Sequence, residues 1–466
     1  MTTRRERSRI SNSDASPSAR KRSQRERLLN AMTELAAEHG FHGVRIAQVS
    51  SRAGVSMTTF YEQFADKEDC MVAAYGRAAE LMLAPLAPTE GSGEWCETVQ
   101  SALRELLLSV QSNTDAGRVV MIEGLVAGTR LRAERRRVVH EFERRAQDLL
   151  GQAPKDGFTL DIPTVAVIGA IRSIVSRHLR THAEDRLPLL VTDIVRWMTS
   201  YARPAGKERW STAADALLPA SAAPFVAGAA QPPARALAPL PRGRHGLPAN
   251  VVARSQRTRI MYAVAEVTMT KGYADTTITD IVAAAGVARE VFYEHFTDKQ
   301  HAFLEAQQHP TQHLLETCVA AYFRGRDWPE RVWNALRVVT DTLAANPAIS
   351  HLRTVECYAA GPAAIRRAEE ITRSFTMFWE EGYHYRPQAA RLPRLCSQAI
   401  AGAIFEIIQR EVARGEGDNL TRHLPQLTYI ALAPFTGAEQ AIERLEQISA
   451  EAQAGANANA DAVVSA

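Results

Sequence analysis

Two short segments of the sequence place side chains that can hydrogen-bond to nucleic-acid bases directly after an Ala-Gly-Val triplet. The triplets are Ala53-Gly54-Val55 and Ala285-Gly286-Val287. Hydroxyl groups can reach bases or phosphates, threonine methyls can contact thymine, arginine can pair with guanine, and glutamate can accept from cytosine. Glu290 could instead pair with Arg289. The first reading set is Ser56, Met57, Thr58 and Thr59, and the second is Ala288, Arg289, Glu290 and Val291.

These side chains need a short helix whose first turn faces the major groove. Gly54 supplies the tight turn before that helix, because glycine tolerates a positive φ. Ser56 follows as a good N-cap residue. A short helix, a tight turn and a second short helix make a helix-turn-helix motif. Both segments predict this motif.

Residues that flank the reading sets are expected to contact the phosphate backbone. Tyr61, Tyr293, Lys67 and Lys299 are predicted at phosphates, and the lysines are helped by the helix N-termini on which they sit. The alternative for each tyrosine is a packing role with its hydroxyl in water. The remaining members of the predicted DNA-contacting set are Arg45, Thr277 and His295. Thr277 also fits an N-cap, with Asp280 three residues later completing an approximate capping box.

The whole chain is a repeat, because the similarity continues beyond the two motifs. The motifs are related by an offset of 232 residues, and the segments after them by an offset of 233. Such a repeat indicates one unit of about 200 residues that is present twice. Matched pairs at the second offset include Trp95 and Trp328, Glu123 and Glu356, Phe142 and Phe375, and Gly169-Ala170-Ile171 and Gly402-Ala403-Ile404.

Positive charge is concentrated just before each motif. The chain has 466 residues and a net charge of +3, but residues 1–27 carry +6 and residues 242–259 carry +5, which leaves −8 for the rest. A solvated, disordered tail is one explanation of such a run. Because both basic segments lead into a helix-turn-helix, contacts to nucleic-acid phosphates are favoured instead.

Composition and motifs argue against several other classes of protein. The five cysteines are scattered without a CxxC pair, which argues against a zinc site or a disulfide framework and fits a reducing cytosol. No signal peptide or membrane-spanning segment is apparent. We find no nucleophile, phosphate-loop or metalloprotease motif, so we expect no enzyme activity and no cofactor. The expected location is the cytoplasm, in association with the nucleoid.

Apolar residues recur at helical spacing, and Pro- and Ala-rich stretches separate the repeats. This pattern predicts helices at 96–111, 116–128, 131–150, 162–182 and 186–202. It also predicts seven segments: a disordered basic arm (1–23), a first helix-turn-helix domain (24–75), a first helical sensor and dimerisation domain (76–202), a linker (203–253), a second helix-turn-helix domain (254–306), a second sensor and dimerisation domain (307–450) and a disordered tail (451–466).

Each repeat resembles a TetR-type transcriptional regulator. The resemblance rests on an amphipathic helix ending in Gly-aromatic, then Ala-Gly-Val, and then Tyr-x-x-Phe-x-x-Lys, within residues 24–75 and 256–306. It implies an all-helical protein with two tandem units, each a three-helix DNA-binding domain followed by a helical ligand-sensing and dimer-forming domain. Family members are usually repressors that leave DNA when a small molecule binds. The departures from the family pattern are Ala288 in place of Ser56, Glu290, and Met57 and Arg289 just before a position that is often Gly.

The repeat leads to a hypothesis about the operator. The two units could pair within one chain as a pseudo-dimer and read two different half-sites of an asymmetric double-stranded DNA operator. One alternative is a homodimer of whole chains with four DNA-reading helices. Another is that only the first unit binds DNA, while the second serves for pairing and sensing in homodimers. The apolar helices at 162–182 and 186–202 suit a partner interface, although an internal core would explain them too.

The effector is expected to be a small molecule in an apolar pocket. At helical spacing, however, large apolar residues are more often plain core. The candidate pocket residues are Trp95, Met121, Phe142, Trp328, Phe375, Phe378 and Trp379.

Overall fold

The apolar periodicity of the sequence is realised as helices along nearly the whole described chain. The computed structural model describes residues 17–86, 95–125, 129–151, 158–204 and 247–464. Apart from turns, these ranges are helical except for one antiparallel pair of short strands, β1 (Phe158–Leu160) and β2 (Ala202–Pro204). The predicted all-helical fold class is confirmed, with this two-stranded pair as a small addition.

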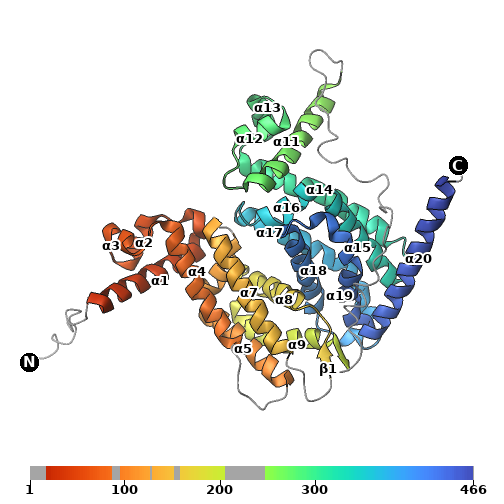
Figure 1. Cartoon of the computed structure of the whole chain (residues 1–466), viewed down its shortest axis with the longest axis horizontal. Coiled ribbons are helices and arrows are strands. Elements are labelled where there is room, and N and C mark those ends of the chain that lie inside the picture. The colour runs from red at the N-terminus through yellow and green to blue at the C-terminus, as the bar shows by residue number, and fades with distance from the viewer. Residues whose placement is uncertain (1–16, 87–94, 126–128, 152–157, 205–246, 465–466) are drawn as a thin grey trace, which may run out of the picture. The chain divides into compact units, whose positions relative to one another are not determined.

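The chain forms two compact units (Figure 1). Unit 1 consists of residues 1–84 and 112–140, and unit 2 of residues 85–111 and 141–466. Unit 1 therefore holds the first helix-turn-helix. Unit 2 holds most of the first sensor segment and the whole second repeat. Residues 112–140, which we expected in the first sensor domain, group with the first helix-turn-helix instead.

The helical elements follow the repeat. Those of the first repeat are α1 (Pro17–Gly43), α2 (Ile46–Ala53), α3 (Met57–Gln63), α4 (Lys67–Leu83), η1 (Ala84–Leu86), α5 (Trp95–Ser112), α6 (Thr114–Met121), η2 (Glu123–Leu125), α7 (Thr129–Gly151), α8 (Thr164–Arg180), η3 (Glu184–Leu190) and α9 (Val191–Thr199). Those of the second are α11 (Ala249–Lys271), α12 (Ile278–Ala285), α13 (Arg289–His295), α14 (Lys299–Tyr322), α15 (Trp328–Ala345), α16 (Pro347–His351), η5 (Leu352–Glu356), α17 (Pro362–Ser374), η6 (Phe375–His384), η7 (Ala389–Arg391), α18 (Leu395–Ala413), η8 (Gly417–His423), α19 (Leu424–Thr436) and α20 (Ala438–Val464).

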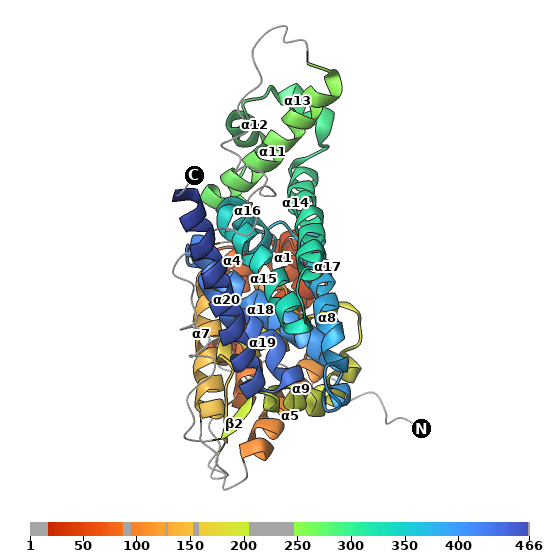
Figure 2. The same cartoon turned by 90° about the vertical axis from the view of Figure 1, so that its right-hand side faces the viewer.

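Helices α1, α2 and α3 form the first helix-turn-helix domain in unit 1. The apolar side of α1, formed by Leu28, Met32, Leu35 and Ala36, is buried, and so are Phe60 and Phe64 after the turn. Gly54 ends α2 in the left-handed conformation, with a φ of 62°, as the tight turn requires. Helices α11, α12 and α13 repeat this arrangement in unit 2, where Gly286 has a φ of 59°. Figure 2 shows these three helices grouped at one end of α14.

Within unit 2, α8 of the first repeat packs closely against α18 of the second. The contact centres on Gly169 and Gly402, which the repeat matches to each other. A methyl group on Gly169 would lie 2.9 Å from the Gly402 carbonyl oxygen, and one on Gly402 would lie 3.0 Å from the Gly169 carbonyl oxygen. The reciprocal distances mean that the same position of each repeat meets its own counterpart. Only glycine at both positions permits this approach.

Polar contacts surround the glycine pair. Arg172 Nε donates to Glu406 Oε2 over 3.0 Å, and the two side chains are largely buried. Arg177 donates to Gln398 Oε1 over 2.9 Å. Farther along, the Tyr201 hydroxyl donates to the Ile430 carbonyl of α19 over 2.7 Å. The two repeats are therefore joined inside unit 2 by an apolar crossing with paired charges around it.

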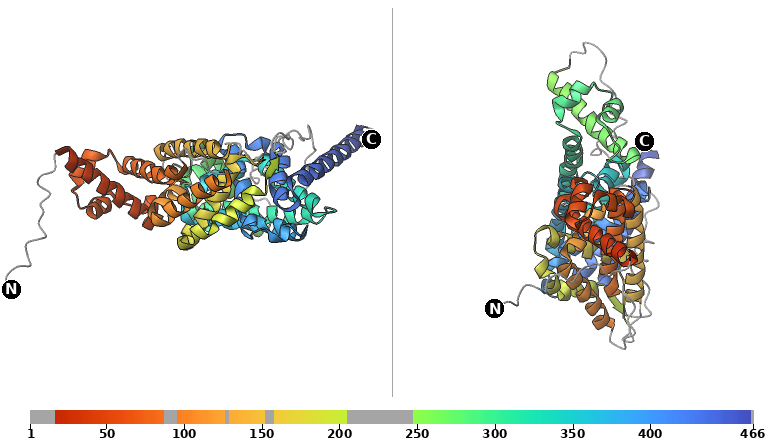
Figure 3. Two further views of the ribbon diagram at one scale, coloured as in Figure 1. Left: turned by 90° about the horizontal axis from the view of Figure 1, so that it is seen from below. Right: turned by 90° about the vertical axis from the view of Figure 1, so that its left-hand side faces the viewer.

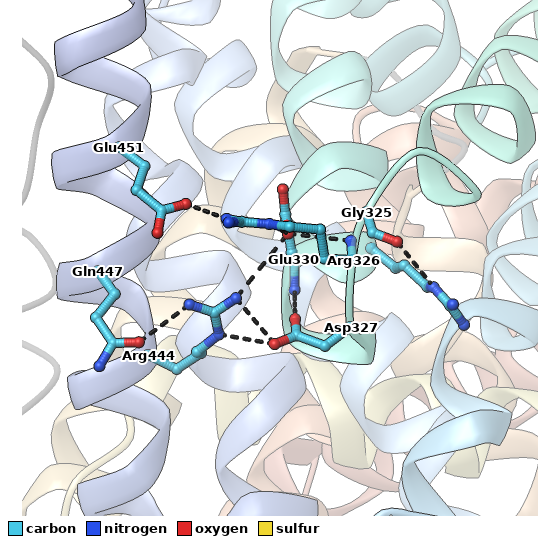
Figure 4. Close-up of polar contacts among 8 residues, drawn as sticks. Gly325, Arg326, Asp327, Glu330, Arg444, Gln447 and Glu451 are labelled. Atoms are coloured by element: carbon cyan, nitrogen blue, oxygen red, sulfur yellow. Dashed lines mark hydrogen bonds and ion pairs between the residues drawn. The ribbon is translucent and has the colours of Figure 1, made fainter.

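Helix α20 lies along the start of α15 and is tied there by ion pairs (Figure 4). Arg444 Nε donates to Asp327 Oδ2 over 3.0 Å, while Asp327 Oδ1 caps α15 by accepting from the Glu330 amide. Arg326 pairs with both Glu330 and Glu451. Figure 3 shows α20 as one long, uninterrupted helix.

The predicted bounds of the basic arm, the linker and the C-terminal tail are partly wrong. Residues 451–464 continue α20, because they are rich in alanine, the strongest helix former, and because Glu451 is anchored by Arg326. Residues 17–23, which we expected in the disordered arm, belong to α1, and residues 249–253, which we expected in the linker, belong to α11. Beyond Pro17 at the first position of α1, neither stretch contains a Gly or Pro that would interrupt a helix. The expected arm at 1–16 and the linker at 205–246 lie outside the described residues. The predicted helix 116–128 is also wrong in part, since α6 ends at Met121 and η2 follows.

Two further properties bear on function. Among the described helices, none combines the length and the hydropathy needed to cross a bilayer. The described residues also contain no cluster of three or more His, Cys, Asp or Glu side chains that could hold a metal ion.

Candidate nucleic-acid interface and effector pocket

The first reading set lies on the surface of α3. Met57 is 42% exposed and Tyr61 is 55% exposed, and Ser56 and Thr58 are exposed as well. The Ser56 hydroxyl accepts from the Thr59 amide over 3.0 Å and lies 3.0 Å from the Thr59 hydroxyl, so it caps the helix as predicted. Thr58 has no hydrogen-bond partner in the described part of the chain. Its hydroxyl and methyl are therefore available to a ligand.

The second reading set is equally exposed on α13 but is built differently. Ala288 offers no side-chain cap. Arg289 lies over the Tyr293 ring, with its guanidinium carbon 5.9 Å from the ring centre, and its Nη2 is 3.5 Å from the Tyr293 hydroxyl. No ion pair joins Arg289 to Glu290 among the described residues. The guanidinium and the carboxylate are thus separate exposed groups.

Lys67 and Lys299, which we predict at phosphates, each donate to backbone carbonyls of their own domain. Lys67 Nζ donates to the carbonyls of Phe41 and Val44 over 3.1 and 3.0 Å. Lys299 Nζ donates to those of Tyr273 and Thr276 over 2.7 and 2.8 Å. Burial lowers the pKa of both ammonium groups. Each lysine therefore closes the connection between the first two helices of its own domain.

Arginines in the third turn of α1 and of α11 hold α3 and α13 in place, a role that the charge count alone did not indicate. Arg25 Nη1 donates to the Gln63 carbonyl at the end of α3, over 3.1 Å, and stacks on the Phe64 ring. Its counterpart Arg257 makes the same two contacts with His295 and Phe296. The available signal was the arginine's recurrence at the motif offset of 232.

The other three residues predicted to contact DNA, which are Arg45, Thr277 and His295, differ in their exposure and in their hydrogen bonds. Arg45 is exposed, and its amide donates to Gln48 Oε1 over 2.9 Å. Thr277 and Asp280 form the predicted capping box of α12. A hydrogen bond from Lys271, followed by hydrogen bonds from Thr277, lowers the pKa of Asp280 to about 2. His295 is half-buried at the end of α13, and burial lowers the pKa of its ring.

A buried carboxylate secures the junction between the first two helices in each repeat. Glu123 Oε2 accepts from the Phe41 amide over 3.1 Å, and Glu356 Oε2 accepts from the Tyr273 amide over 2.6 Å. Burial raises the pKa of Glu123. The sequence matched these two residues to each other but did not reveal this role. They connect each helix-turn-helix to the helices that follow it.

A cavity of about 90 Å³ lies in the second sensor domain, inside unit 2. It is lined mainly by apolar side chains from α14, α15, α17, η6 and α18. Of the predicted pocket residues, Phe375 and Trp379 line it. Phe378 and Trp328 are core instead, with Trp328 Nε1 donating to the Phe378 carbonyl over 3.1 Å. Trp95, Met121 and Phe142 do not line this cavity.

Comparison with known proteins gives two kinds of match. Residues 28–74 and 260–306 each match the family described as "Bacterial regulatory proteins, tetR family". Over 156 residues the chain is 26% identical to the HTH-type transcriptional activator FasR of Mycolicibacterium smegmatis, a match that covers 34% of this chain and 60% of FasR. The match thus spans less than two thirds of that relative.

Solved structures resemble part of the chain. FadR from Bacillus halodurans, a fatty acid degradation regulator, matches 38% of this chain and 94% of its own, with 17% identity and a TM-score of 0.32. FadR from Bacillus subtilis in complex with stearoyl-CoA matches 37% and 96%, with 16% identity and a TM-score of 0.32. Each repeat of the chain therefore begins with the DNA-binding domain of the tetR family of bacterial regulatory proteins.

Proposed function

We propose that this chain is a ligand-responsive transcriptional regulator that binds DNA through both α3 and α13. In this proposal the two sensor domains pair within one chain as a pseudo-dimer. Because the exposed reading sets differ, the operator has two unlike half-sites. A dimeric helix-turn-helix protein reads half-sites one helical turn, about 34–36 Å, apart. The same spacing is expected between the two halves of this operator.

The observation that carries the proposal is the reciprocal contact between Gly169 and Gly402. In a symmetric dimer the same patch of each subunit meets its own copy. Here two copies of one repeat meet in this way inside one chain. The α8–α18 contact thus has the character of a subunit interface, which supports pairing within the chain over pairing between chains.

Two measurements on the full chain test the proposal. Selection of bound sequences from random DNA is expected to yield two different half-sites at a fixed spacing. Light scattering is expected to give the mass of one chain, 51.2 kDa. A palindromic selected site together with a mass near twice that value would favour the homodimer with four reading helices.

A second candidate is that only the first helix-turn-helix binds DNA. The missing cap at Ala288 and the exposed acid at Glu290 favour it. Gel-shift assays of Thr58→Ala and Arg289→Ala separate the candidates. If both helices read DNA, Arg289→Ala should lose about 1–3 kcal/mol of discrimination at one guanine. Unchanged affinity and preference for Arg289→Ala, alongside a loss for Thr58→Ala, would leave the first domain alone on DNA.

The effector in this proposal is a small apolar molecule bound in the cavity of the second sensor domain. Its apolar lining, including Phe375 and Trp379, supports this assignment. We further propose repression that is relieved by the effector. Transcription in vitro from a promoter with the selected operator tests the direction, and increased transcription by the effector-free protein would make the chain an activator.

A further inference from the structure

A charged side chain lies in the wall of the apolar cavity. Arg353, in the π-helical turn η5, is only 6% exposed and lines the cavity together with apolar residues. Buried arginines are normally paired, because an isolated charge in an apolar environment is costly. The apolar residues that line the cavity include Leu336, Ile371, Phe375, Trp379, Ile404 and Phe405.

Within the described protein, Arg353 has no hydrogen-bond or ion-pair partner. Its charge acts on the thiols of Cys318 and Cys357. Burial raises the pKa of Cys318 to about 12 and also raises the pKa of Cys357, so both thiols are neutral near pH 7. Burial lowers the pKa of Arg353 to about 10, so the guanidinium remains charged. Its charge is therefore uncompensated.

Two comparisons sharpen this observation. Arg172, another largely buried arginine of unit 2, is paired with Glu406. The indole Nε1 of Trp379, whose ring lines the same cavity as Arg353, is buried without an acceptor among the described residues. By contrast, the Thr354 and Thr372 hydroxyls of the lining already donate to the Ser350 and Ala368 carbonyls. The unsatisfied groups of the lining are donors, and one of them is a cation.

We propose that this cavity binds an apolar organic acid, whose carboxylate pairs with Arg353 while its hydrocarbon part contacts the apolar lining. A guanidinium can bind a carboxylate through two parallel hydrogen bonds, which gives both strength and orientation. This inference rests on the proposed effector-binding function and specifies the chemical class of the ligand.

The same turn links the cavity to the second helix-turn-helix. Arg353 and Glu356 are both in η5, and Glu356 accepts from the Tyr273 amide between α11 and α12. The Tyr273 carbonyl in turn accepts from Lys299. π-helical turns often occur at functional sites. A carboxylate that moves Arg353 therefore acts on the turn that secures the DNA-binding domain.

The first repeat does not carry this cation. At the offset of 233 residues, Val120 stands where the second repeat has Arg353, whereas Glu123 matches Glu356. The proposal therefore predicts one carboxylate site of this kind per chain.

Isothermal titration calorimetry of the full chain tests the proposal, with hexanoate, octanoate and decanoate as probes and the corresponding neutral amides as controls. We expect at least one acid to bind at one site per chain, about tenfold or more tighter than its amide. Arg353→Met should abolish this preference, and Arg353→Lys should retain part of it. Arg366→Met, which removes an exposed arginine of α17 outside the cavity, should behave as the wild type.

Three outcomes would overturn the proposal: no acid of the panel binds, acid and amide bind equally, or Arg353→Met keeps the preference. Circular dichroism of each variant identifies any loss of folding, in which case Arg353→Lys decides. The DNA selection described above is independent of this test. Operator binding without acid binding removes only this inference, whereas acid binding without DNA binding removes the proposed function.

Discussion

The two helix-turn-helix domains share a scaffold but differ in how their helices begin. In the first, Ser56 caps the recognition helix α3, while the preceding helix α2 has no side-chain cap from Arg45. In the second, Thr277 caps α12, and α13 begins at the uncapped Ala288. The contacts of Arg25 with the end of α3 recur as those of Arg257 with the end of α13. The comparison teaches that the repeat preserves the contacts that hold α3 and α13 and varies the exposed residues at the start of these two helices.

The largest expected effect comes from breaking the contact between the two repeats. Gly402→Leu would force a side chain against Ser173 and the Gly169 carbonyl, so we expect the free energy of unfolding of unit 2 to fall by about 3 kcal/mol. Denaturant unfolding followed by circular dichroism measures this loss. The control is Ala413→Leu at the exposed end of α18, which should change little. Equal stability of both variants would contradict the close approach.

Substitution of Lys67 and Lys299 tests whether their contacts with backbone carbonyls contribute equally to the stability of the two helix-turn-helix domains. Lys67→Met and Lys299→Met each leave backbone carbonyls without their charged donor, so each should cost about 2 kcal/mol of stability. Hydrogen exchange of the corresponding helix-turn-helix amides locates each loss. If these lysines contacted phosphates instead, the variants would weaken DNA binding in proportion to salt while stability stayed unchanged.

A pH titration examines the buried carboxylate of the first repeat. Because burial raises the pKa of folded Glu123 above its ordinary value, this residue contributes most stability at low pH, and the contribution is lost as pH rises through the folded pKa. Glu123→Gln keeps an acceptor for the Phe41 amide but removes the charge. We expect it to be more stable than the wild type at pH 7, by about 1 kcal/mol, and equal below pH 4. The prediction is refuted if the wild type gains stability relative to Glu123→Gln as the pH rises from below 4 to 7. The control is Glu62→Gln at an exposed position, which should show no such difference.

The smallest expected effect is an exchange of caps. Ser56→Ala should destabilise α3 by about 1 kcal/mol, and Ala288→Ser should stabilise α13 by a similar amount. Thermal unfolding of both single variants and of the double variant measures the two changes, which should be additive because the sites are independent. Ala288→Ser without any gain would show that the α13 N-terminus is satisfied in another way.

The sequence predicted the scaffold well because its signals are local. Apolar spacing and the glycines at the turns determine the helix-turn-helix, and an offset in the chain reveals the second copy. The roles of Lys67, Arg25 and Glu123 depend on which carbonyl or amide lies nearby after folding, so spacing alone could not assign them. The pocket was predicted only in part for the same reason. Phe375 and Trp379 line it, but adjacent Phe378 is core, and nothing local in the sequence singled out Arg353.

The contact between Gly169 and Gly402 also has a consequence for how the protein responds to dilution. Since both glycines belong to one chain, their association is governed by an effective concentration that the covalent connection sets, not by the amount of protein in the cell. The thermal midpoint of unit 2 therefore should not depend on protein concentration, unlike that of an obligate homodimer. In the pseudo-dimer that we propose, the two unlike halves would stay together even when the chain is scarce.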